Sequence, residues 1–116
     1  MFDPFSLGAL AALFGKAILA GLAMGTVIVV FVAIVRWKEV ITWFRDRQNL
    51  KDEDKDNIAV TLLERLKQGP EKGYKLIQGI FNKREGTIKE GIIQKTKELD
   101  EELRDAHKGH KLVVYE

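Results

Sequence analysis

Few side chains in this 116-residue sequence could act as a nucleophile or hold a metal ion. The chain has no cysteine and its only serine is Ser6, so the usual nucleophile and base pairs of hydrolases cannot be assembled. His107 and His110 have the spacing of two metal ligands on one helical face. Gly109 is expected to end the helix between them, which favours exposed imidazoles. The sequence predicts no enzyme, no cofactor and no metal.

Three aspartates begin a pattern that is typical of calcium loops. Asp52, Asp54 and Asp56 alternate along the chain, as in the first half of an EF-hand. The second half of the pattern fails, because Asn57 replaces the required glycine and Leu63 replaces the final glutamate. We therefore expect residues 48–57 to form a polar linker.

The lysines and arginines are the best candidates for a ligand site. Residues 65–97 are mainly basic, whereas residues 98–116 are mainly acidic. The two regions could neutralise each other, or the basic face could bind an anionic ligand such as a nucleotide. DNA or RNA is not expected, because residues 48–116 carry no net charge and no recognised stacking motif. The possible anion contacts are Lys75, Lys83, Arg84, Lys89 and Lys95.

The elements that would position these residues follow a long apolar run. Residues 17–35 contain no charged side chain and would reach about 28 Å as a helix, against roughly 30 Å of hydrocarbon. Only a helix satisfies its own backbone groups in lipid, so we predict one transmembrane helix. A cleaved signal peptide is disfavoured, because no basic residue precedes Lys16.

The residues that flank the apolar run predict an orientation. Basic side chains cluster after it, which predicts an N-terminus outside and a cytoplasmic C-terminal domain. Lys16 is expected to reach lipid headgroups, although a ring of Lys16 side chains in a pore is an alternative. The expected membrane-interface anchors are Lys16, Arg36, Trp37, Lys38, Trp43 and Arg45.

Small residues in the run predict self-association. Ala17, Gly21 and Gly25 recur every four residues, in the manner of GxxxG motifs. Close approach of helix backbones at these positions predicts a homo-oligomer.

The rest of the chain predicts a small α+β unit. Helical spacing continues past the apolar run through residues 36–50. Residues 58–68 fit a strand or a helix, and β-branched residues favour the strand. Residues 74–82 and 87–96 flank a hairpin turn. A helix over 98–108 and a strand over 111–116 complete the prediction.

The expected hairpin has apolar side chains on both faces, and one short helix covers only one. Residues of the first strand, a neighbouring subunit or a protein partner would then cover the other. The predicted fold is a single-pass transmembrane helix followed by an antiparallel meander with one helix and a final strand. Its expected parts are residues 1–47, 48–57 and 58–116.

Two functions fit this organisation. The first is a non-enzymatic membrane anchor, or an accessory subunit of a membrane complex, that docks proteins. The alternative is an oligomeric, membrane-perturbing effector that senses an anionic signal.

Overall fold

Helix α1 (Leu7–Met24) and strand β1 (Val27–Val35) divide the apolar N-terminal run between them. The computed structural model describes residues 7–66, 73–108 and 111–115. Among these residues, no helix has the length and apolar character needed to cross a membrane. The predicted transmembrane helix over 17–35 is therefore wrong. The single-pass localisation, the membrane anchor and the membrane effector are corrected with it, because each depended on that helix.

Local geometry explains the division. Gly25 has a φ of +83°, a conformation that ends helices and that glycine adopts without strain. Thr26 N then donates to Gly21 O at 2.9 Å and closes the turn. The segment VIVVFVAIV that follows is rich in β-branched residues, which pack well in sheets. In lipid, the need to satisfy backbone hydrogen bonds within one segment would favour a helix over this preference for strands.

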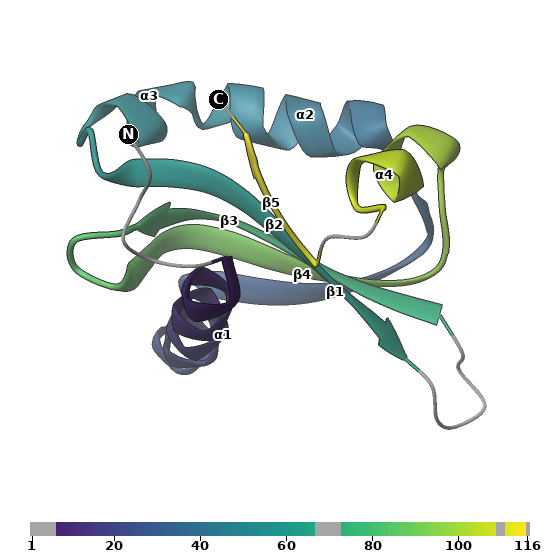
Figure 1. Cartoon of the computed structure of the whole chain (residues 1–116), viewed down its shortest axis with the longest axis horizontal. Helices are drawn as coiled ribbons and strands as arrows, with labels where there is room; N and C mark the ends of the chain where they lie inside the picture. The colour runs from purple at the N-terminus through teal and green to yellow at the C-terminus, as the bar shows by residue number, and fades with distance from the viewer. Residues whose placement is uncertain (1–6, 67–72, 109–110, 116) are drawn as a thin grey trace.

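Five strands form one mixed sheet in the order β1-β4-β3-β2-β5 (Figure 1). Strand β1 runs parallel to β4, and the remaining pairs are antiparallel. The other elements are α2 (Trp37–Asp46), α3 (Gln48–Asp52), β2 (Asn57–Leu66), β3 (Gly73–Asn82), β4 (Thr87–Leu99), α4 (Glu101–Ala106) and β5 (Leu112–Tyr115).

Most of the elements expected after residue 36 lie where the sequence predicts them. The β3–β4 hairpin is confirmed. Residues 58–68 were predicted as a strand or a helix, and their described part, up to Leu66, belongs to strand β2. The helix expected over 98–108 is shorter, because β4 continues to Leu99 and Asp100 caps α4. Part of the linker expected over 48–57 is helical as α3. The stretch 67–72, Ser6, Gly109 and His110 lie outside the described residues.

Helices cover both faces of the sheet. Figure 1 shows α1 on one side and α2, α3 and α4 on the other. On the α1 side, Phe14 is fully buried and its ring meets Phe81 edge to face at 5.8 Å between centroids. On the opposite side, Val40 and Phe44 of α2 pack with Leu103 of α4. The second face of the sheet, for which first-strand residues, a subunit or a partner were the expected covers, is therefore covered by α1 from the chain's own apolar run.

Candidate functional site

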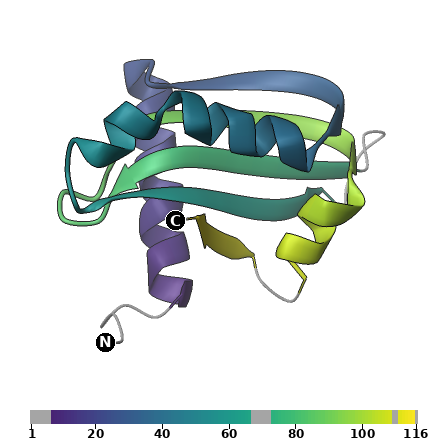
Figure 2. The same cartoon turned by 90° about the horizontal axis from the view of Figure 1, so that it is seen from above.

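A groove of about 390 Å³ lies between helices α2 and α3 and the β2–β5 end of the sheet. Its volume is within the usual range for ligand sites. In Figure 2, β5 is displaced to one side of α2, and β2 lies between them in this view. Four lining residues come from α2, so the helix forms one wall. We call this the α2–β5 groove; its lining residues are Trp37, Ile41, Phe44, Arg45, Gln48, Lys51, Ala59 and Tyr115.

The sequence of α2 explains how the wall forms. Val40 and Phe44 are buried against the sheet, which fixes the rotation of the helix. The adjacent side carries Trp37, Ile41 and Arg45 at intervals of four, so their side chains follow one line into the groove. Trp37 N donates to Asp100 Oδ2 at 2.8 Å, which ties the start of α2 to the start of α4.

Aromatic rings hold β5 against α2. The ring of Tyr115 lies 5.7 Å from that of Trp37 and 5.1 Å from that of Phe44, centroid to centroid. Such pairs stabilise by about 0.5–1.5 kcal/mol beyond their buried area. Tyr115 is the last residue of strand β5, so these ring contacts fix the end of the strand beside the groove.

A buried hydroxyl fixes Tyr115 further. Thr61 Oγ1 lies 2.7 Å from the Tyr115 hydroxyl and 2.8 Å from His107 Nε2. Burial raises the pKa of the Tyr115 phenol, against the opposing effect of its bond to Thr61, so the phenol keeps its proton at neutral pH. His107 is buried, which corrects the expected exposed imidazole.

Two cations border the α2–β5 groove without a carboxylate partner. Arg45 is exposed and Lys51 is half-buried. Within residues 7–66, 73–108 and 111–115, neither side chain forms an ion pair. Their positive charge is therefore available to an anionic group in the groove.

The five cations proposed from sequence do not meet at one site. Lys75 pairs with Glu64 at 3.6 Å and Lys89 with Glu85 at 2.7 Å. Lys95 lies over the Phe31 ring, and Lys83 donates its backbone N–H to Asp56 O.

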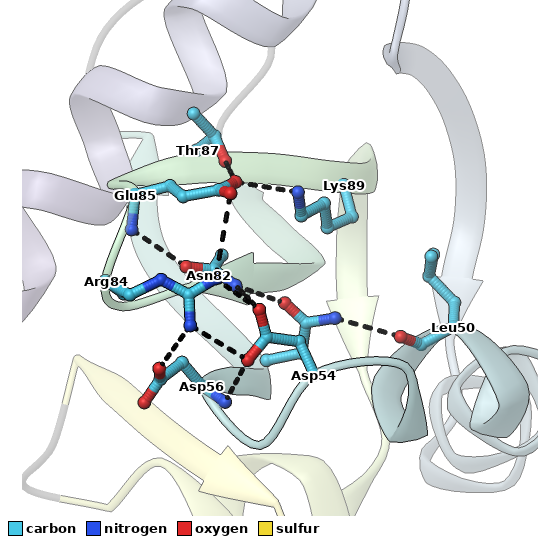
Figure 3. A network of polar contacts seen from close by, with 9 residues as sticks. Leu50, Asp54, Asp56, Asn82, Arg84, Glu85, Thr87 and Lys89 are labelled. Carbon is cyan, nitrogen blue, oxygen red and sulfur yellow. Dashed lines mark hydrogen bonds and ion pairs between the residues drawn. The ribbon is translucent and has the colours of Figure 1, made fainter.

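Arg84 belongs to a network that closes one end of the sheet (Figure 3). Its guanidinium contacts Asp54 Oδ2 at 2.6 Å and Asp56 Oδ2 at 2.8 Å. Asn82 Nδ2 donates to Asp54 and to Asn57 Oδ1 in the same network. These bonds tie the loop before β2 to the β3–β4 turn, and so two of the three alternating aspartates bind an arginine. Among the described residues, no group of three or more acidic or histidine side chains could hold a metal ion.

The three residues proposed for packing between membrane helices have other surroundings. Ala17 lies on the side of α1 that packs against the sheet and is buried in the core. A Cβ on Gly21 would approach Val27 Cγ2 to 2.5 Å, and Gly25 forms the turn into β1. Gly21 and Gly25 therefore serve the junction between α1 and β1.

Of the six expected membrane anchors, Lys16 lies on α1, and the other five lie on α2 or directly before it, on the opposite side of the sheet. Lys16 is exposed on α1, and Arg36 and Lys38 are exposed at the start of α2. Trp43 packs under Arg47, whose guanidinium carbon lies 3.9 Å from the ring centroid. Of this set, Trp37 and Arg45 reach the α2–β5 groove.

Sequence reasoning missed the groove as a site. Ile41, Gln48, Lys51 and Tyr115 were not proposed as binding residues. The spacing along α2 gives a partial signal, because Trp37, Ile41 and Arg45 share one side of that helix. No local sequence pattern indicates that Tyr115 lines the groove, because its position depends on the pairing of β5 with β2.

No family model, no curated protein and no solved structure matches this chain.

Proposed function

We propose that this chain is a non-enzymatic recognition domain that binds an acidic, extended segment of another protein in the α2–β5 groove. The observation that carries the proposal is the pair Arg45 and Lys51, which border an aromatic groove without forming an ion pair in the described part of the chain. A cation without an ion-pair partner can bind a carboxylate, and the apolar rings beside it can contact a large apolar side chain. The groove therefore suits a ligand that carries both groups.

The shape of the groove favours an extended chain. Its lining follows α2 from Trp37 to Arg45, which is about 12 Å at the helical rise, and continues onto α3 at Gln48 and Lys51. The α2 wall alone matches roughly four residues of extended peptide.

The lining chemistry supports binding rather than catalysis. Among the described residues that line the groove, none is a serine, cysteine, histidine or carboxylate that could act as a nucleophile or base. The Tyr115 hydroxyl is already hydrogen-bonded to buried Thr61. The polar groups that face a ligand are those of Arg45, Gln48 and Lys51, which donate hydrogen bonds and stabilise negative charge.

A random-sequence peptide display selection against the full chain tests this proposal. We expect the enriched peptides to contain Asp or Glu next to a large apolar residue. Trp37 lines the groove, so binding of a synthetic peptide with an enriched sequence should change the fluorescence of Trp37. The chain has two tryptophans, so measurement in a Trp43→Phe variant assigns the change to Trp37.

Charge reversal supplies the control. The double variant Arg45→Glu, Lys51→Glu should bind the enriched peptide at least about tenfold more weakly, a loss of about 1.4 kcal/mol in binding free energy. Lys38→Glu changes an exposed cation on the same helix outside the groove and should leave binding unchanged. The proposal fails if selection enriches no acidic peptide, or if Lys38→Glu weakens binding as much as the double variant.

A further inference from the structure

Strand β1 leaves one long edge of the sheet open. In the strand order β1-β4-β3-β2-β5, β1 is terminal and pairs only with β4 within the described residues. Its nine residues span about 30 Å at the rise of a strand. The backbone groups that point away from β4 therefore present a row of donors and acceptors.

The open edge lacks the features that normally prevent pairing between sheets. Exposed edges usually carry charged residues, proline or a bulge, or are very short. The segment VIVVFVAIV has no charged residue and no proline or glycine. The opposite edge, β5, has only four residues. Strand β1 is therefore the edge that favours addition of another strand.

Apolar side chains are exposed along the same edge. The exposed fractions are 57% for Ile28, 41% for Val29 and 70% for Phe31, and Met24 just before the strand is 79% exposed. Ile28, Val29 and Phe31 lie within β1 and Met24 ends the helix just before it, so exposed apolar side chains accompany the open backbone edge.

We propose that a second copy of this chain covers the edge, through antiparallel pairing of β1 with β1 about a two-fold axis. A symmetric contact of this kind closes at two copies. With the axis at Phe31, all nine residues pair: Val27 lies opposite Val35, and Ile28 lies opposite Ile34.

Charge favours a second copy in this orientation. Because β1 is uncharged, self-pairing places no like charges opposite each other within the ladder. Exposed Arg36 follows the strand directly. Antiparallel pairing puts it opposite Thr26 of the second copy, whereas parallel pairing would bring two Arg36 side chains together. The inference is independent of the α2–β5 groove, which lies at the other end of the sheet.

Sedimentation of the full chain over a wide concentration range tests the dimer. We expect a species of twice 13.2 kDa. Phe31→Glu changes an exposed side chain and places a carboxylate beside Lys95, its partner on β4, so folding should survive. Two glutamates would then face each other across the axis, and dissociation should become at least about tenfold more favourable. Val114→Glu, a matched change on β5, should leave the dimer intact.

Single cysteines test the register, because the native chain has none. Phe31→Cys lies on the axis, where directly opposite Cα atoms are about 4.5–5.5 Å apart and a disulfide can form. Ile28→Cys lies six positions from its own copy and should not cross-link on oxidation. The inference is overturned if the chain stays monomeric, if Phe31→Glu leaves the dimer intact, if Val114→Glu dissociates it, or if Ile28→Cys cross-links in place of Phe31→Cys.

Discussion

Individual cations of this chain differ mainly in whether a carboxylate lies within reach. Arg84 contacts Asp54 and Asp56, so its charge stabilises the junction between a loop and a turn. Arg45 and Lys51 have no such partner in the described part of the chain and border a groove instead. The position of each cation relative to the acids therefore separates structural charges from those available to a ligand.

The Asp54–Arg84 pair predicts a dependence of stability on pH. The hydrogen bond from Arg84, helped by the backbone N–H of Asp56, lowers the pKa of Asp54 from 3.8 to about 2 in the folded chain. A lowered pKa means that the contribution is complete above 3.8 and is lost as the pH falls through about 2. Wild type should therefore lose its stability advantage over Asp54→Asn across this interval, as measured by urea unfolding. Asp46→Asn, an exposed aspartate on α2, is the control; a constant difference between wild type and Asp54→Asn would contradict the expectation.

At the scale of elements, the junction of α1 and β1 decides the architecture. The helix ends where Gly25 takes a positive φ, and Val27 then packs back against Gly21. Gly15 lies in the same helix with no atom near the position of a Cβ. A side chain can therefore be added at Gly15 without a steric clash, whereas at Gly21 it would clash with Val27 and Thr26.

Alanine substitutions at these glycines should move stability in opposite directions. Gly15→Ala should raise the free energy of unfolding by about 0.5–1 kcal/mol, because alanine is the better helix former. Gly21→Ala should lower it by about 1–3 kcal/mol, because the new methyl group overlaps Val27 and Thr26. Chemical denaturation of both variants measures the difference. Equal stabilisation by both changes would mean that Val27 does not pack on Gly21.

The whole molecule is a sheet whose two faces are both apolar and both covered. Helix α1 supplies one cover and α2 with α4 supplies the other. Without α1, the side of the sheet that carries Ile77, Phe81 and Ile93 would lose its contacts with Phe14 and Ile18. The N-terminal apolar segment is therefore part of the core of the folded unit.

Truncation of Phe14 tests that role. Phe14 is fully buried, so Phe14→Ala should lower the free energy of unfolding by about 3–5 kcal/mol. Leu19→Ala, on the same helix but 68% exposed, should change it by no more than about 0.5 kcal/mol. Thermal or urea unfolding measures both. A negligible effect of Phe14→Ala would show that α1 does not stabilise the sheet.

The amino-acid sequence alone determined the features that depend on neighbouring residues. The turn between residues 82 and 87 and the alternating residues around it predicted the β3–β4 hairpin, and helical spacing predicted α2. Only the tertiary structure decided how residues 17–35 are used, because an uncharged run is stabilised by lipid or by a sheet face alike. The contacts of Arg84 with Asp54 and of Tyr115 with Phe44 join distant parts of the chain, so chain folding rather than local pattern created the network and the groove.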